Sequence, residues 1–411
     1  MSGPARTPFD AVIVGAGPAG SASAIQLARA GWSVALVERQ RFPRRKVCGE
    51  CIAASNMPLL QDLGIGASFK ARAGAALRRV TLLRDDDEVT ADLPAARHDH
   101  FPWGRALGRE TLDGLLLDAA RHAGAVVLQP WAVQSIAGSA GAWHCELRAL
   151  ESATPLHLRA QVVIDAHGSW EDLPTDRPRR RLARDAADLF AFKANFTGAS
   201  LPEDAISVLA LDGGYGGMVL GDGGVTTVAC CIRRDRLGRL RDAAPGLRAG
   251  DAVQAWLLGA CGGTRQALQG SLRQGSWLTS GPLNPGVRVG ARDGIFRVGN
   301  AAGEAHPILG EGISMALQSA ALLCSHLLRE PAVGAVPDGA LQAVLQRRYA
   351  ADWRSEFGPR LRVASAFAHL AMRPHGAAAL MQAARIWPGL LTRGARWGGK
   401  VRLADAAGRA P

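Results

Sequence analysis

The segment from residue 9 to residue 39 most constrains the fold of this chain, because it reads FDAVIVGAGPAGSASAIQLARAGWSVALVER. A short apolar run over residues 9–14, typical of a strand buried on both faces, ends at the sequence G-x-G-x-x-G. The first glycine of such a turn allows the tight bend, the second lets a diphosphate approach the backbone, and the third lets a helix pack on the strand. We therefore expect a helix from Pro18 to about residue 30, a second strand over residues 32–37, and a dinucleotide at the start of the helix.

Glu38 follows the second expected strand, at the position about 20 residues after the glycines where dinucleotide folds bind a ribose 2′-hydroxyl. A carboxylate there repels a 2′-phosphate, so the sequence favours FAD or NAD over NADP in this pocket. The alternative is a glycine turn with a purely structural role. The residues expected to contact the nucleotide are Gly15, Ala16, Gly17, Pro18, Ala19, Gly20, Glu38 and Arg39.

The bulk composition favours a large soluble protein. The chain has 411 residues, of which 48% are hydrophobic, which suggests two or three domains. Its net charge of +12 indicates either a solvated basic surface or attraction of NAD(P)H, an acidic carrier protein or an anionic membrane face. Nucleic acid is not expected as a partner, because no recognition motif accompanies the charge and aromatic residues make up only 5%.

The cysteines and the apolar runs indicate the cellular compartment in which the protein is expected. Seven cysteines, an odd number in a long chain, do not form an obvious disulfide framework. No second pair of cysteines or histidines has zinc-like spacing, so no metal site is expected. There is no recognisable signal peptide and no run of 18 apolar residues, so we expect a cytoplasmic protein without a membrane span.

The order of the remaining patterns predicts a discontinuous nucleotide domain. A helix is expected over residues 109–123, short strands over 76–104, antiparallel strands over 134–158 and a separate buried strand over 161–165. Residues 188–280 are strand-rich with one helix near 252–260, and 330–411 favour helices broken at Pro337, Pro359, Pro374 and Pro388. The expected fold class is α/β, with a Rossmann-like nucleotide domain (1–75, 105–170, 285–330), an inserted, mostly antiparallel β-sheet substrate domain (76–104, 171–284) and a C-terminal helical region (331–411).

A second motif lies at residues 294–320, which read GIFRVGNAAGEAHPILGEGISMALQSA. Together with the opening glycine turn it resembles the group A FAD-dependent monooxygenases and the related geranylgeranyl-reductase-like flavoproteins, which have the p-hydroxybenzoate-hydroxylase-type fold. Their signature is G-D-A-A-x-x-x-x-P-x-x-G-x-G. The resemblance covers roughly residues 9–330 and implies FAD as the bound cofactor and NAD(P)H as the reductant.

The resemblance also implies roles for single residues. Asn300 stands where the family has an aspartate that holds the ribityl chain, and Pro307 would lie against the isoalloxazine. A helix start at residues 310–313 would offer N–H groups to the flavin edge, where reduced flavin is anionic. Arg109 matches the family's R-x-x-L-D arginine, with a surface salt bridge as its alternative. The implied cofactor contacts are Arg109, Gly168 (in a third motif where His167 replaces aspartate), Gly299, Asn300, Pro307, Gly310, Gly312 and Ile313.

Residues 46–50, KVCGE, resemble the K-x-C-G-G/E segment of the geranylgeranyl-reductase-like branch. The resemblance places Cys48 and Gly49 close to the flavin. Cys48 with Cys51 also forms C-x-x-C, so a flavin-side cysteine, a redox dithiol and plain buried cysteines remain alternatives. Glu50 would orient Cys48 or a water molecule, or act as a helix-start carboxylate.

Residues 210–219 align with a Y-x-W run that covers the substrate in these relatives. Tyr215 matches, whereas Gly217 replaces the tryptophan and implies a roomier pocket. We expect Phe192, Tyr215 and Gly217 to bind substrate. The W-x-W-x-I-P pattern of flavin halogenases is absent, which argues against that activity.

The implied function is an NAD(P)H- and O2-dependent monooxygenase that hydroxylates an apolar aromatic or polyketide-like molecule, free or bound to a carrier protein, through a flavin C4a-hydroperoxide. Catalytic candidates are Cys48, Glu50 and His306, with His98 and His100 as lesser candidates for a base that deprotonates a phenol. The alternatives are an FAD-dependent reductase of isoprenoid or polyketide double bonds and a non-catalytic flavin-binding redox partner. The last 80 residues combine arginines with tryptophans and either pack in the core, cap the substrate channel or touch a membrane. The oligomeric state is left open.

Overall fold

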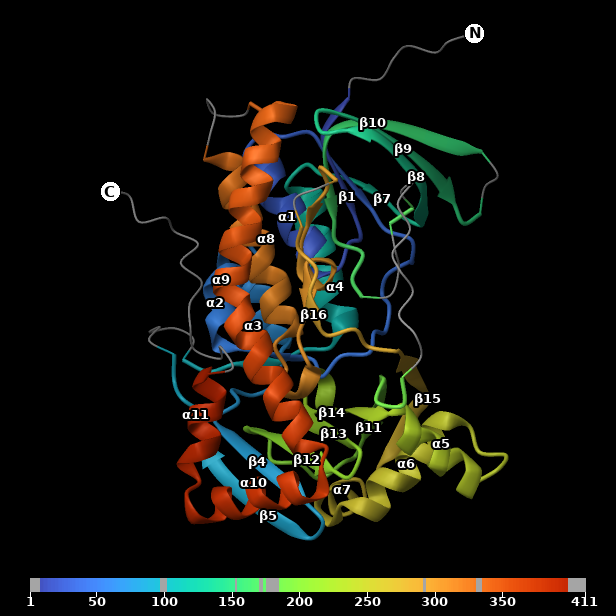
Figure 1. Ribbon diagram of the computed structural model, residues 1–411, viewed down its shortest axis with the longest axis vertical. Coiled ribbons are helices and arrows are strands. Elements are labelled where there is room, and N and C mark those ends of the chain that lie inside the picture. Colours follow the sequence, from blue (N-terminus) through green and yellow to red (C-terminus); the bar gives the residue numbers. More distant parts are fainter. Residues whose placement is uncertain are drawn as a thin grey trace.

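The computed structural model describes residues 8–96, 102–151, 154–169, 173–174, 185–290, 293–329 and 335–397. Two large sheets occupy opposite ends of the molecule, and the long helix α9 (Gly339–Ala371) runs along both of them (Figure 1). Strands and helices of the nucleotide-binding type build one end, and a mostly antiparallel sheet builds the other. The expected α/β class with an inserted sheet and a helical C-terminal region is confirmed.

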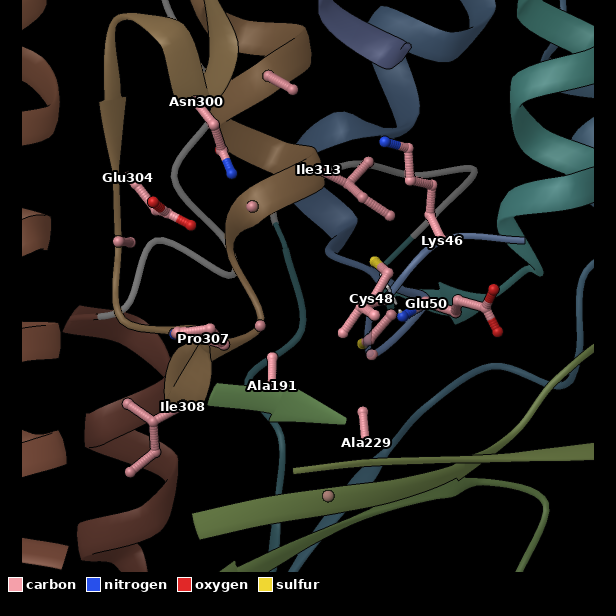
Figure 2. Close-up of a pocket in the computed structure, with 18 of the residues that line it drawn as sticks. Lys46, Cys48, Glu50, Ala191, Ala229, Asn300, Glu304, Pro307, Ile308 and Ile313 are labelled. Carbon is pink, nitrogen blue, oxygen red and sulfur yellow. Dashed lines mark hydrogen bonds between the residues drawn. The ribbon is translucent and has the colours of Figure 1, made fainter. Parts of the chain in front are cut away.

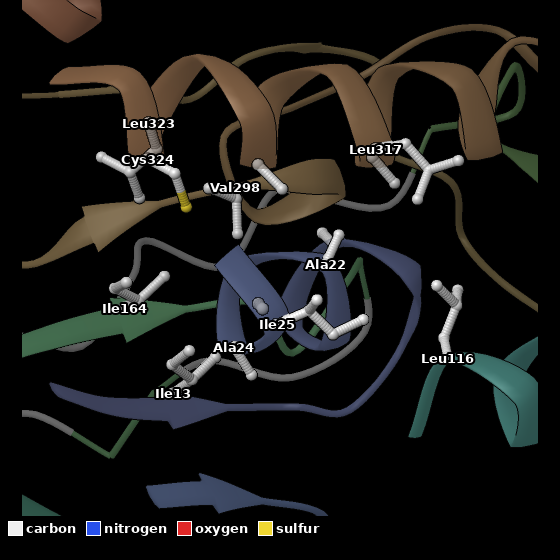
Figure 3. Packing of buried hydrophobic residues seen from close by; sticks show 14 of the residues in the cluster. Ile13, Ala22, Ala24, Ile25, Leu116, Ile164, Val298, Leu317, Leu323 and Cys324 are labelled. Carbon is white, nitrogen blue, oxygen red and sulfur yellow. The ribbon is translucent and has the colours of Figure 1, made fainter. Parts of the chain in front are cut away.

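The first sheet has the strand order β7-β2-β1-β10-β9-β8, and β17 also pairs with β10. Its core strands are parallel, and residues 11–14 of β1 are buried, which explains their unbroken apolar run. Helices α1, α4 and α8 pack around the glycine turn, with Ile13, Ile25 and Leu317 in one cluster (Figure 3). The elements are β1 (Phe9–Val14), α1 (Pro18–Arg29), β2 (Val34–Val37), α4 (Arg109–His122), β7 (Val126–Leu128), β8 (Trp131–Ser139), β9 (Ala142–Ala149), β10 (Pro155–Asp165), β17 (Phe296–Arg297) and α8 (Gly312–Leu328).

Strand β10 corrects the expectation of separate strands before and after residue 160. Its first half, from Pro155 to Ala160, pairs antiparallel with β9, and its second half pairs parallel with β1. The sequence changes from alternating to continuously apolar because one strand passes from the partly exposed edge of the sheet into its fully buried centre.

The second sheet has the strand order β15-β11-β14-β13-β12-β4-β5, and only the β12–β4 pair is parallel. Strands β4 and β5 precede helix α4 in the sequence, and the other five strands follow it. Two separate segments of the chain therefore build one continuous sheet. The strands are β4 (Arg79–Arg84), β5 (Asp87–Asp92), β11 (Leu189–Thr197), β12 (Ala205–Leu211), β13 (Gly214–Leu220), β14 (Val225–Arg233) and β15 (Leu272–Ser280).

Three helices, rather than the single one expected near residues 252–260, lie between β14 and β15. They are α5 (Arg234–Ala243), α6 (Ala249–Ala260) and α7 (Gly262–Ala267). Helix α5 has no fully buried residue and packs only Leu237 and Leu240 against the core, so its apolar stripe is too short to stand out among its charged residues. Trp256 and Leu257 of α6 pack against one face of the second sheet, which leaves the other face for the cavity described below.

The C-terminal region consists of α9, α10 (Pro374–Ile386) and α11 (Gly389–Trp397). Asp338 caps α9 by accepting a hydrogen bond from the Leu341 N–H at 2.8 Å. Pro359 lies inside α9 and does not break it, contrary to expectation. Trp353, Phe357 and Leu361 are buried on both sides of the proline, and this packing holds the helix together across the missing hydrogen bond.

The remaining short elements connect the two ends. They are β3 (Cys51–Ile52) paired with β6 (Arg105–Ala106), α2 (Met57–Asp62), α3 (Gly66–Arg72), and β16 (Gly286–Val287) paired with β18 (Gly303–Glu304). No helix within the described ranges is long and apolar enough to cross a membrane.

Candidate functional site

A cavity of about 890 Å³ extends from the glycine turn after β1 to helix α11. Its walls come from the first sheet's loops, the face of the second sheet opposite α6, and helices α9, α10 and α11. Figure 2 shows the middle of this cavity, where Cys48, Pro307, Ala191 and Ala229 face a common space.

The glycine turn leaves no room for side chains at two of its positions. Gly15 has φ +102°, and a Cβ on it would lie 2.5 Å from the Ala166 carbonyl oxygen. A Cβ on Gly20 would lie 1.8 Å from the Gly15 carbonyl oxygen, so helix α1 could not pack this closely with any other residue. At Gly17, the Cβ position lies 3.8 Å from Arg109 Nη2 and 3.9 Å from Arg44 Nη2. The start of α1 therefore faces two guanidinium groups, which is a site for a diphosphate.

Glu38 holds the turn from the other side and is almost completely buried. Its Oε2 accepts a hydrogen bond from the Ala16 N–H at 3.0 Å, and its Oε1 accepts one from the Gln40 N–H at 2.8 Å. Arg44 Nη2 lies 3.3 Å from the same carboxylate. Glu38 and Arg39 both line the cavity, where a carboxylate can also accept a hydrogen bond from a ribose hydroxyl.

Arg109, the first residue of α4, is held in a bidentate ion pair with Asp113 at 2.7 Å for both contacts. The Arg109 side chain is only 12% exposed and lines the cavity, so this pair is not the surface salt bridge considered as an alternative. Burial disfavours the charged guanidinium, but the negative charge and hydrogen bonds of Asp113 favour it more strongly. The pKa of Arg109 is therefore raised. Burial lowers the pKa of Arg44 despite the attraction of Glu38. It also lowers the pKa of Lys46 to about 8, with the repulsion of Arg44 next.

The segment with Cys48 and Gly49 lies along the cavity wall. Cys48 Sγ accepts a hydrogen bond from the Glu50 N–H at 3.3 Å and also contacts Arg109. Cys51 is buried in the small β3–β6 sheet, and neither Cys48 nor Cys51 is part of a disulfide.

Glu50 is a buried positioning residue with φ +57°, an unusual backbone conformation for a side chain of this kind. Its Oε1 accepts hydrogen bonds from the Arg109 N–H at 2.7 Å and from Lys193 Nζ of β11. Its Oε2 accepts one from Thr227 Oγ1 of β14 at 2.5 Å. The carboxylate points away from Cys48 (Figure 2). Of the two roles considered from the sequence, this geometry matches the helix-start carboxylate, because Arg109 opens α4.

The second motif places a polar chain at the opposite wall. Asn300 Nδ2 donates to Ser169 Oγ at 2.7 Å, and Ser169 Oγ donates to Glu304 Oε1 at 3.0 Å. Glu304 also accepts from the Asn284 N–H and from Arg288. Burial raises the pKa of Glu304. Asn300, Ser169 and Glu304 all line the cavity, and in Figure 2 the labelled Asn300 and Glu304 side chains point into one space.

Helix α8 begins at the cavity without a side-chain cap on its N-cap residue. Gly310 has φ +63°, which turns the chain into the helix, and Gly312 and Ile313 line the cavity with Pro307. Gly299, at φ +60°, and Gly168, at φ +98°, lie on the same wall. The free N–H groups of a helix start supply positive potential at this point.

His306 does not line the cavity among the described residues, although its neighbours Ala305 and Pro307 do. Its ring packs edge-on against His369 of α9, with the ring centroids 5.5 Å apart. Burial, and next the repulsion of His369, lower the pKa of His306 to about 4. The structure thus places the first candidate for a base away from the substrate space. His98 and His100 lie outside the described residues.

The substrate side of the cavity is the second sheet. Tyr215 is buried with Ala191 and Cys231, and burial raises the pKa of its hydroxyl well above the ordinary value. Gly217 lies two residues along the same strand face, where a Cβ would approach the Ser207 carbonyl oxygen to 2.9 Å. Phe192 borders the cavity, but its side chain belongs to the core beneath the sheet, in contact with the α6 cluster. The neighbouring Ala191 presents its side chain to the cavity instead (Figure 2).

Residues 8–196 match the family model of the FAD binding domain. The chain therefore carries an FAD-binding domain over these residues, which are a little under half of its length. The menaquinone reductase of Mycobacterium tuberculosis is 36% identical over 120 residues, which are 29% of this chain and only 28% of that protein. Digeranylgeranylglycerophospholipid reductase 1 of Methanopyrus kandleri is 27% identical over 372 residues, which cover 85% of this chain and 87% of that protein.

The whole fold also has close structural counterparts. The FAD-dependent myxobacterial chondrochloren halogenase superposes with a TM-score of 0.71 over 94% of this chain and 90% of that one. At 20% identity this likeness establishes the fold and not the activity.

The cavity fits FAD on its own geometry. One end is a glycine cradle faced by Arg44 and Arg109, and the start of α8, without a side-chain cap, lies further along the same cavity. Within the described residues, no group of histidine, cysteine, aspartate and glutamate side chains is arranged to hold a metal ion.

Several site residues escaped the sequence analysis. Arg44 and Lys46 belong to a run of basic residues, which in a sequence looks the same as a solvent-exposed basic surface. The only signal for Glu304 was a carboxylate within an otherwise apolar motif. Lys193, in the middle of an apolar strand, was the one available signal of a buried partner for Glu50.

Proposed function

We propose that the protein is an NAD(P)H- and O2-dependent FAD monooxygenase that hydroxylates an apolar aromatic or polyketide-like molecule. The observation that carries this proposal is the floor of the cavity on the second sheet, where Gly217 and the two alanines Ala191 and Ala229 of Figure 2 offer almost no side-chain bulk. Such a floor accommodates a flat ring system, and the small residue at position 217 is what makes room for it.

The residues present would hold FAD along the whole cavity. Arg44 and Arg109 would bind the diphosphate at the start of α1, and Glu38 the adenosine ribose. Asn300, supported by Ser169 and Glu304, would bind the ribityl chain, and the N–H groups at the start of α8 would face the ring edge. When bound and reduced by NAD(P)H, FAD supplies the electrons that let O2 give one oxygen atom to the substrate and the other to water.

The protein's own contribution would be binding, orientation and exclusion of water. Phe367, Leu370 and Ala371 of α9 close the cavity opposite the sheet. Tyr215, Cys230 and Cys231 all have pKa values raised by burial, so they stay protonated at neutral pH. None of these three groups would act as a base, so we expect a substrate ring that is already electron-rich, such as a resorcinol or an aminophenol.

Oxygen uptake tests the proposal. Purified protein loaded with FAD should oxidise NADH or NADPH faster when electron-rich phenols are added. Product formed under 18O2 should gain one labelled oxygen atom for each NAD(P)H consumed. Full turnover under strictly anaerobic conditions would instead exclude a monooxygenase.

A second candidate is a reductase of carbon–carbon double bonds, favoured by the position of Cys48. Its thiol lies in the cavity wall, across the open space from Pro307, where it could protonate a carbon atom after hydride addition (Figure 2). The relatives that are named as reductases support the same candidate. Anaerobic reduction of a prenylated quinone that is lost in Cys48→Ala, with FAD content unchanged, would favour it, whereas stoichiometric oxygen uptake would exclude it.

A further inference from the structure

The cavity does not end at the expected flavin and ring positions but continues as an apolar passage. Beyond Tyr215 its walls are Val80 and Leu82 of β4 and Val208 of β12, faced by Phe367 of α9 and Leu391 of α11. The passage therefore leads from the second sheet to the C-terminal helices.

Trp397 marks the rim of this passage. It lines the cavity and is nevertheless 63% exposed. Ile386, the last residue of α10, is 84% exposed, and Trp387, which follows it, is 44% exposed. Large exposed apolar side chains thus lie on the same two helices that contribute to the wall of the passage.

The charges on these helices all have one sign. Between residues 373 and 397 the sequence contains Arg373, Arg385, Arg393 and Arg396 and no acidic residue. Arg393 stacks on the Trp387 ring at 4.4 Å, and both Arg393 and Arg396 are exposed. Arg385 is paired with Asp87 of β5, so its charge is already balanced. Exposed tryptophans beside unbalanced arginines are typical of a surface that lies in the headgroup layer of an anionic membrane.

We propose that α10 and α11 dock on an anionic lipid bilayer, so that the apolar substrate passes from the bilayer into the cavity beside Trp397. The proposal that these helices dock on a bilayer depends only on the exposed residues of α10 and α11. The passage of substrate rests on the proposed function, which places the reaction at the far end of the same cavity.

Vesicle binding without any substrate tests the docking independently of catalysis. FAD-loaded full-length protein should float with vesicles of phosphatidylglycerol and phosphatidylcholine, and markedly less with phosphatidylcholine alone. Arg393→Gln/Arg396→Gln should weaken binding to the phosphatidylglycerol vesicles about 25-fold at low salt, because each arginine near an anionic surface contributes about fivefold. Trp387→Ser/Trp397→Ser should weaken binding on both kinds of vesicle.

Matched variants keep the test specific. Arg239→Gln/Arg241→Gln on α5 and Leu272→Ser on β15 remove equally exposed groups from a distant part of the surface and should bind as the wild type does. An unchanged FAD content shows that each variant is folded. Absence of binding to phosphatidylglycerol vesicles, equal binding by the α11 variants, or binding only to an acidic acyl carrier protein would each overturn the proposal. None of these results would bear on the oxygen-uptake and 18O2 assays of the proposed function, which need no vesicles.

Discussion

Lys193 of β11 donates a hydrogen bond to the Glu50 carboxylate, and both side chains are almost fully buried. The two residues belong to different ends of the molecule: Glu50 lies beside the first helix turn of α4, and Lys193 lies in the second sheet. Thr227 adds a second contact from the same sheet. This buried ion pair therefore fixes the substrate sheet relative to the segment that carries Cys48.

Removing one partner of this pair should destabilise the protein strongly. Lys193→Met leaves the Glu50 charge buried without its counter-ion, which costs about 3–5 kcal/mol. The double variant Lys193→Met/Glu50→Gln should recover much of this loss, because no uncompensated charge remains. Urea unfolding followed by circular dichroism measures both variants. If Lys193→Met unfolds at the wild-type urea concentration, the pair has no such role.

The two guanidinium groups over Gly17 should dominate the affinity for FAD. Arg44→Gln or Arg109→Gln should raise the FAD dissociation constant at least about tenfold, because a hydrogen bond to a charged group contributes about 1.5–3 kcal/mol. Arg121→Gln is the matched control, since Arg121 lies on the same helix but is exposed and paired with Asp118. Recovery of flavin fluorescence on dilution reports the constant. Equal constants for the Arg44 and Arg121 variants would contradict the placement of the diphosphate.

The two hydrogen bonds that link Asn300, Ser169 and Glu304 run in one donor-to-acceptor direction, and two substitutions should reverse that direction. Asn300 donates to Ser169, and Ser169 has one proton to give to Glu304. Asn300→Asp alone should weaken FAD binding, because two carboxylates then compete for one hydroxyl proton. Asn300→Asp/Glu304→Gln should restore it, with the amide now donating from position 304. The FAD dissociation constant and the flavin reduction potential are the measurements, and a double variant as weak as the single one would refute this reading.

His306 should make the folded state sensitive to acid. Its folded-state pKa of about 4 lies below the ordinary value of 6.5. The unfolded state therefore binds the proton first, and the stability present above pH 6.5 is lost as the pH falls towards 4. The loss is at most about 3 kcal/mol, at about 1.36 kcal/mol for each pH unit of difference.

The variant His306→Asn should flatten this part of the stability profile. Urea midpoints measured at pH 7 and pH 4.5 compare it with the wild type, and the exposed His122→Asn serves as the control. Identical pH dependence in wild type and His306→Asn would show that another group is responsible.

Local patterns predicted the nucleotide end of the fold well. The apolar run, the glycine spacing and Glu38 together define a strand–turn–helix unit, because each depends on contacts between residues near in the sequence or on backbone sterics at a glycine. The second motif likewise predicted the start of α8. Helix α5 was missed because only two leucines form its apolar stripe, and the uninterrupted course of α9 was missed because tertiary packing overrides Pro359.

By itself the sequence determined the glycine turn after β1 and the start of α8, where we propose that the diphosphate and the flavin edge bind, because backbone N–H groups and absent side chains form those places. Only the tertiary structure decided which side chains complete them. Glu50 meets Lys193 across 143 residues and Thr227 across 177, Asn300 meets Ser169 across 131, and His306 turns towards α9 instead of the cavity. The course of the apolar passage to α11 was decided in the same way. Such pairings depend on how two sheets and three chain segments pack together, and no periodicity within one segment records that packing.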